Sequence, residues 1–197
     1  MEPQDSHFPS TVIEMLRATT ALVPDKAALM APGRPDFSRT NLLQHVEDTV
    51  ARLNSIGFTR TSRIALALPN GPEAAGVFVC VVAGMIAVPL NPNFLATEFE
   101  FQLRLAKADA VIILQGQNTP IRAVAERLGV RIIELRFTPD MPAGFFEIVG
   151  TLPTAIPPTF SQASDIAVMM PTSGTTGLPK FVPQTHAKII IGVIYES

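Results

Sequence analysis

Apolar and polar positions follow two different periods along the chain, which predicts helices and strands in turn. Segments with apolar residues three or four positions apart are typical of helices that bury one face. Short continuous apolar runs, such as Val111 to Leu114, are typical of strands inside a parallel sheet. We expect helices at 10–22, 41–56, from 72 onward, 97–107 and 121–128, and strands at 27–30, 64–68, 87–90, 111–114, 131–135 and 166–170. This alternation predicts an α/β fold with a parallel sheet layered with helices.

One long apolar stretch, residues 74–90, contains no charged side chain. A membrane-spanning helix needs about 20 apolar residues, and Gly84 and Pro89 interrupt this run. We therefore expect a buried helix followed by a core strand, and no transmembrane segment. Cys80, the only cysteine, lies in this stretch, so we expect a buried, inert thiol rather than a disulfide or a metal ligand.

The helix–strand alternation stops between residues 136 and 164. Five prolines fall in this segment, at positions 139, 142, 153, 157 and 158. Because proline fixes φ and lacks an amide hydrogen, regular structure is disfavoured there. We interpret residues 136–164 as a Pro-rich connecting loop on the surface that is variable and mobile.

Composition and charge narrow the classes of function. Charged residues make up 16% of the chain, below the roughly 25% of average soluble domains, and mean hydropathy is +0.31, which indicates a piece of a larger core. The net charge of −2 and the absence of a basic patch argue against a nucleic-acid partner. The first five residues are polar and acidic rather than basic and apolar, so we expect no secretory signal and a cytoplasmic location.

Nine residues near the C-terminal end carry the main chemical signal. Gly174 and Gly177 can take positive φ, so backbone amides can converge on an anion. Hydroxyl groups add donors, and Lys180 adds a positive charge. Pro179 and Phe181 stand where the Walker A pattern needs glycine and a hydroxyl residue, so this is not that motif. We predict a phosphate-binding turn; the alternative is an ordinary Gly/Thr-rich surface turn. The residues are Thr172, Ser173, Gly174, Thr175, Thr176, Gly177, Leu178, Pro179 and Lys180.

This nine-residue segment resembles the signature loop of the adenylate-forming superfamily, also called AMP-binding or acyl-activating enzymes. The superfamily includes acyl-CoA synthetases, aryl-CoA ligases, firefly-type luciferases and the adenylation domains of peptide synthetases. Residues 63–73, 83–92 and 182–186 resemble neighbouring segments of the same family. One departure is Phe181, which stands where the family usually has glycine, and a bulky residue there is expected to alter how the loop folds back.

The resemblance implies an enzyme like an acyl- or aryl-CoA synthetase. Such an enzyme uses ATP and Mg²⁺ to convert a carboxylic acid into an acyl-adenylate, and CoA is the co-substrate that then forms a thioester. Residues 172–180 would hold the β- and γ-phosphates, and Thr172 would bind Mg²⁺ or a phosphate.

Family members are typically more than twice as long as this chain. Residues 1–197 are therefore expected to be the N-terminal, incomplete portion of the AMP-binding large domain, without the C-terminal lid domain. The missing remainder of the enzyme would be the partner of this portion, which is expected to be inactive alone.

Three other interpretations stay open. The chain could be a fragment of a peptide-synthetase-type adenylation domain, a non-catalytic nucleotide-binding or interaction module, or a phosphotransferase with an unusual phosphate loop. The histidines do not favour any of them. His186 follows Thr185, a plausible N-cap, and we expect it to be structural, whereas His45 and His7 are expected to be solvated.

Overall fold

The computed structural model of the 197-residue chain describes residues 8–151, 153–172 and 180–196. The helices are α1 (Val12–Leu22), α2 (Arg39–Ser55), α3 (Pro72–Gly84), α4 (Ala96–Ala106), α5 (Pro120–Leu128) and α6 (His186–Glu196). The strands are β1 (Ala27–Leu29), β2 (Phe37–Ser38), β3 (Arg63–Leu66), β4 (Ile86–Pro89), β5 (Ala110–Leu114), β6 (Arg131–Arg136), β7 (Glu147–Ile148), β8 (Ile166–Thr172) and β9 (Lys180–Thr185). Strands β1 and β2 pair in a small antiparallel sheet.

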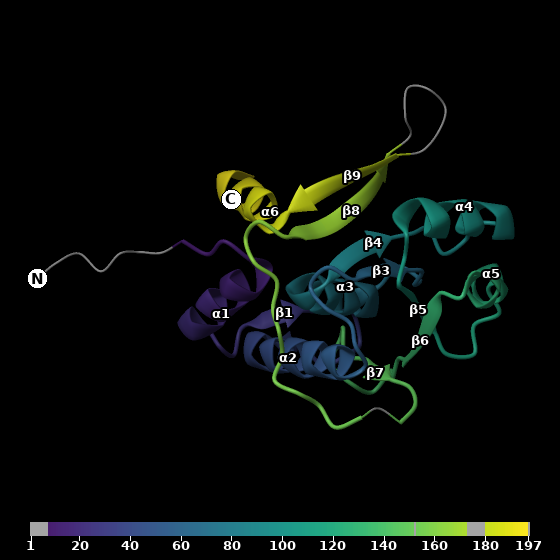
Figure 1. Ribbon diagram of the computed structural model, residues 1–197. Coiled ribbons are helices and arrows are strands. Elements are labelled where there is room, and N and C mark those ends of the chain that lie inside the picture. Colours follow the sequence, from purple (N-terminus) through teal and green to yellow (C-terminus); the bar gives the residue numbers. More distant parts are fainter. Residues whose placement is uncertain (1–7, 152, 173–179, 197) are drawn as a thin grey trace, which may run out of the picture.

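The main sheet has the strand order β7-β6-β5-β3-β4-β8-β9 in the described part of the chain. Its five inner strands run parallel, and the two edge strands, β7 and β9, run antiparallel to their neighbours. Helices α1, α2 and α3 cover one face, and α4 and α5 cover the other (Figure 1). The predicted α/β layering is confirmed, and the edges depart from a fully parallel sheet because short connections can join only antiparallel neighbours.

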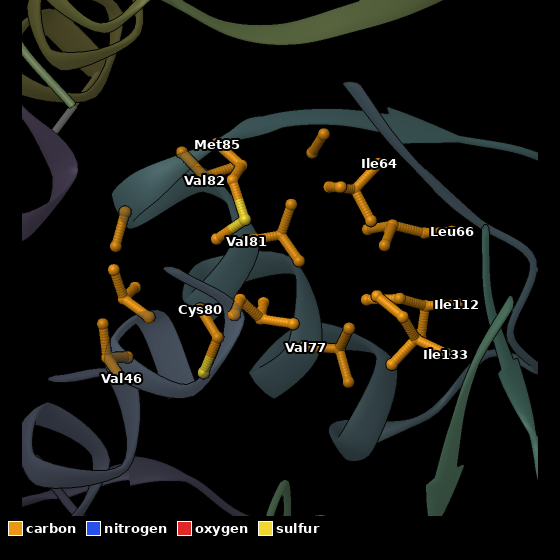
Figure 2. Packing of buried hydrophobic residues seen from close by; sticks show 14 of the residues in the cluster. Val46, Ile64, Leu66, Val77, Cys80, Val81, Val82, Met85, Ile112 and Ile133 are labelled. Atoms are coloured by element: carbon orange, nitrogen blue, oxygen red, sulfur yellow. The ribbon is translucent and has the colours of Figure 1, made fainter. Parts of the chain in front are cut away.

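The centre of the fold is α3, which lies between α2 and the sheet. Figure 2 shows Cys80 and Val81 of α3 between Val46 of α2 and the sheet residues Ile64 and Ile112. The predicted buried helix followed by a core strand is confirmed as α3 and β4. Burial raises the pKa of the Cys80 thiol to about 12, so it is inert at neutral pH, as expected. Within the described residues, no helix has both the length and the apolar character needed to cross a bilayer.

The segment after β6 is more ordered than its prolines suggested. Most of residues 137–165 lack regular structure, but β7 lies among them and pairs with β6. Ala143 and Phe146 are fully buried, and a Cβ atom on Gly76 of α3 would overlap the carbonyl oxygen of Gly144. The expectation of a surface loop was therefore wrong for residues 143–146, because side chains from this part complete the core beside α3.

A partly buried ion pair anchors the same segment to the first turn of α3. Arg34, between β1 and β2, pairs with the carboxylate of Glu73, which also accepts a hydrogen bond from the amide of Gly144 at 3.4 Å. The Arg34 guanidinium also donates to the carbonyl oxygens of Met141 and Pro142, at 2.8 and 3.1 Å. One side chain thus joins three segments that are far apart in sequence.

We expect Arg34→Met to lower the free energy of unfolding by about 3 kcal/mol, because it leaves the Glu73 carboxylate buried without its charged partner. Urea unfolding measures this. The matched control is Arg136→Met, which breaks the exposed Arg136–Glu147 pair and should cost less than about 1 kcal/mol. Equal losses in the two variants would contradict the anchoring role of Arg34.

Candidate functional site

The hairpin of β8 and β9 presents the two ends of the predicted phosphate-binding segment. The register of the hairpin ends with Thr172 paired to Lys180, and the Thr172 hydroxyl donates to the Lys180 carbonyl oxygen at 3.2 Å. Both residues are exposed. The predicted site residues between them lie outside the described residues: Ser173, Gly174, Thr175, Thr176, Gly177, Leu178 and Pro179.

The position of this hairpin in the sheet suits a ligand site. The chain leaves β3 through α3 on one face and leaves β4 through α4 on the opposite face, so the connections diverge at the carboxyl ends of these two strands. Ligands in open α/β sheets bind outside the carboxyl ends of the strands at such a point. Strand β8 is parallel to β4 and adjacent to it, so Thr172 lies at this same edge of the sheet.

Phe181, the departure from the family pattern, has a clear place in the hairpin. It pairs with Pro171 in the register and packs against the core beneath α4, together with Met169. A phenyl ring at this position therefore fastens the start of β9 to the α4 face of the sheet.

The polar groups at Thr172 and Lys180 are compatible with a metal-bound nucleotide. The Thr172 hydroxyl uses its hydrogen in the bond to Lys180, and its oxygen lone pairs remain available to a cation. The Lys180 ammonium makes no ion pair with any residue in the described part of the chain. Within that same part, no three His, Cys, Asp or Glu side chains come close enough to hold a metal ion.

The residues that follow the hairpin are structural, as the sequence predicted. Thr185 accepts a hydrogen bond from the amide of Lys188 at 3.4 Å and so caps α6. His186 is fully buried, and its Nδ1 accepts a hydrogen bond from the amide of Val12 at 3.3 Å. Burial lowers the pKa of His186, with the carboxylates of Asp165 and Glu14 opposing the shift.

His45 corrects a sequence prediction. It was expected to be solvated, but its ring lies 4.8 Å from that of Phe145 and 4.5 Å from that of Phe146, between centroids. Burial lowers its pKa to about 4, Asp48 opposes this shift and Arg52 adds to it. The two phenylalanines come from the Pro-rich segment, so the periodicity of α2 alone gave no sign of them.

A cavity of about 310 Å³ lies next to His45, between α2 and β7. Its rim carries two guanidinium groups, of Arg52 and Arg136, and two carboxylates, of Asp48 and Glu147. Strand β7 is at the opposite edge of the sheet from β9, so this cavity is separate from the hairpin site.

Comparison with known proteins gives one consistent result. The family model described as "AMP-binding enzyme" matches residues 16–195. The oxalate–CoA ligase of Saccharomyces cerevisiae is 30% identical over 156 residues, which are 66% of this chain and 28% of that protein. The 4-coumarate–CoA ligase 1 of Petroselinum crispum is 28% identical over 161 residues, 81% of this chain and 29% of that protein. The chain thus spans about a third or less of the length of these two relatives.

Solved structures show the same fold. ATP-bound MatB from Rhodopseudomonas palustris superposes with a TM-score of 0.71 at 22% identity, over 90% of this chain and 35% of that one. The o-succinylbenzoate CoA synthetase MenE from Bacillus subtilis, solved with an acyl-adenylate intermediate, has a TM-score of 0.71 at 21% identity, over 92% of this chain and 44% of that one.

The half-buried ring of His45, with its lowered pKa, predicts a fold that loses stability in acid. The unfolded chain binds a proton at His45 near its ordinary pKa of 6.5, and the folded chain only near 4. The contribution of His45 to the free energy of unfolding is therefore fully present above about pH 6.5. It is lost as the pH drops toward 4, and the loss amounts to up to about 3 kcal/mol. Urea unfolding across this range should show a smaller fall in His45→Phe. A wild-type pH dependence in that variant would contradict the burial of the ring.

Proposed function

Because the chain belongs to the AMP-binding enzyme family, whose CoA ligases join acids to CoA, we propose that it contributes the phosphate-binding part of an ATP-dependent, AMP-forming carboxylic acid–CoA ligase. The observation that supports this most is the placement of Thr172 and Lys180 as the last pair of a hairpin at the carboxyl edge of the sheet.

The reaction has two steps. An oxygen of the carboxylate attacks the α-phosphorus of ATP, an acyl-adenylate forms, and the bond to pyrophosphate breaks. The thiol of CoA then attacks the acyl carbon, a thioester forms and AMP leaves. Negative charge gathers on the departing pyrophosphate in the first step, so cations and donors fixed around it lower the barrier.

Residues 172–180 supply these groups in our proposal. Backbone amides around Gly174 to Gly177 and the hydroxyls of Ser173, Thr175 and Thr176 hold the β- and γ-phosphates. The Lys180 ammonium offsets the phosphate charge, since it has no competing ion pair among the residues the structure describes. Thr172 offers its hydroxyl oxygen to Mg²⁺, which when bound neutralises part of the phosphate charge.

The chain spans about a third or less of the length of the two ligases compared above, so we propose that its site is incomplete and that it binds the nucleotide without catalysis. The acyl group and the acceptor thiol then meet residues outside this chain. Under the same proposal the protein acts on a small carboxylic acid, with the remainder of the enzyme as its partner, in the cytoplasm.

Calorimetric titration with Mg-ATP tests the phosphate role. Lys180→Ala should weaken binding at least about tenfold, or about 1.4 kcal/mol, because a phosphate loses its cationic partner. The matched control is Lys188→Ala, which removes another exposed lysine, from the first turn of α6, and should leave the affinity unchanged. Equal affinities of wild type and Lys180→Ala would overturn the assignment.

Exchange of labelled pyrophosphate into ATP tests the absence of catalysis. We expect none when the chain is given Mg-ATP with oxalate or 4-coumarate, since the acyl group meets an incomplete site. Exchange above that of Lys180→Ala would show that the chain is a complete adenylating unit. Release of ADP rather than AMP would instead indicate a phosphotransferase.

A further inference from the structure

His186 sits where three helices meet. It is the first residue of α6, it is fully buried, and its Nδ1 accepts the amide hydrogen of Val12, the first residue of α1. The backbone of Val82 in α3 also interacts with the imidazole, and this interaction favours the charged form. The first amides of a helix have no partner within the helix. The Thr11 hydroxyl accepts a hydrogen bond from the backbone amide of Glu14 at 3.2 Å, so it is not the acceptor for Val12. The imidazole of His186 is the acceptor for the backbone amide of Val12.

This hydrogen bond requires a neutral imidazole. A ring nitrogen that accepts a hydrogen bond carries no proton, so the proton of His186 is on Nε2. That atom is buried and has no well-formed hydrogen bond. A second proton would go to Nδ1, and Nδ1–H would then face the amide hydrogen of Val12. Protonation and the contact with α1 therefore exclude each other.

The surroundings of His186 disfavour its protonated, positively charged form. The ring is shielded from water, and it lies at the N-terminal ends of both α1 and α6, where the helix dipoles are positive. Asp165, the backbone of Val82 and Glu14 favour the charged form, but both carboxylates are already engaged. Asp165 is paired with Arg60 at 3.0 Å, and Glu14 accepts from the amide and hydroxyl of Ser10.

We propose that His186 is a proton-sensitive latch that holds α6, and with it the β8–β9 hairpin, against α1 and α3. In its neutral form the latch is closed. When the imidazole gains a proton it loses its acceptor, α1 loses the partner of Val12, and the start of α6 separates from α1.

The hairpin is coupled to this change through its base, whereas the start of β9 is held separately by Phe181 against the α4 face. Strand β9 continues directly into His186, and among the described strands it is an edge strand that pairs with β8. Strand β8 is joined to β4 in register at Ala87 and Val168. Opening the latch therefore loosens the base of the hairpin whose tip carries Thr172 and Lys180. An effect on nucleotide affinity rests on the proposed function, whereas the opening itself does not.

Two substitutions distinguish the effect of protonating His186 from the effect of losing its side-chain packing. His186→Asn keeps an acceptor, because the Asn Oδ1 can take the place of Nδ1, but it does not titrate. His186→Leu fills the space and accepts nothing. All variants are made with His45→Phe as the common background, so that the half-buried His45 does not titrate.

Amide hydrogen exchange, corrected for intrinsic rates, is measured at about pH 7.5 and about pH 5, on either side of the histidine range. In the background protein, protection of residues 12–22 and 180–192 should fall at least about tenfold at the lower pH, since a buried donor loses its acceptor. In His186→Asn these two segments should stay protected at both pH values. In His186→Leu they should lack this protection at both pH values.

Strand β5, in the middle of the sheet, reports on global unfolding and should stay protected throughout. The latch is overturned if β5 loses protection together with α1 and α6, if the background protein shows no pH effect, or if His186→Asn shows the same effect as the background.

Mg-ATP titration of the same samples forms a separate arm. The affinity for Mg-ATP should fall more steeply between about pH 7.5 and about pH 5 in the background protein than in His186→Asn. ATP itself also gains protons in this range, but it does so equally in both samples, so the comparison cancels that effect. Failure to bind ATP at either pH would count against the proposed function, while the exchange measurements would still decide the latch.

Discussion

The whole arrangement depends on the close burial of one apolar helix. Helix α3 lies between α2 and the sheet, and its glycines mark the tightest contacts. A Cβ atom on Gly84 would overlap the Val50 side chain of α2, and one on Gly76 would overlap the backbone at Gly144. Because α3 links β3 to β4, its position on the sheet fixes where the chain leaves β3 and returns to β4. The fit of a helix at van der Waals distance thus determines where the carboxyl edge of the sheet lies.

That edge carries the candidate site. Strand β8 joins it beside β4, and the antiparallel return through β9 brings a threonine and a lysine together at the hairpin mouth. The hairpin is held at its base by the burial of His186 and Ile190 of α6, and near its tip by Phe181 against the α4 face. The hairpin thus has a buried, apolar base that packs against the rest of the fold and exposed, polar residues at its other end.

Much of this could be predicted from sequence because the relevant signals are local. The period of apolar residues locates the helices and inner strands, and the glycine and hydroxyl pattern of residues 172–180 points to phosphate. The contacts that were missed join distant segments: Arg34 with Glu73, His45 with Phe145, and His186 with Val12. The apolar period of one helix or strand carries no information about a contact with a distant segment. The prolines near Phe145 and Phe146 predicted a surface loop, so the burial of this segment was not expected. The roles of residues 173–179 still rest on the sequence pattern.

Pro183 gives the hairpin a further property. It lies in the middle of β9, the strand that borders the sheet, where it is exposed and offers no amide hydrogen. An unpaired strand border is a template on which a second polypeptide can add its own strand, and the aggregates that follow are hard to reverse. A proline interrupts such a template. The hairpin can therefore extend from the sheet without inviting intermolecular strand addition along its outer border.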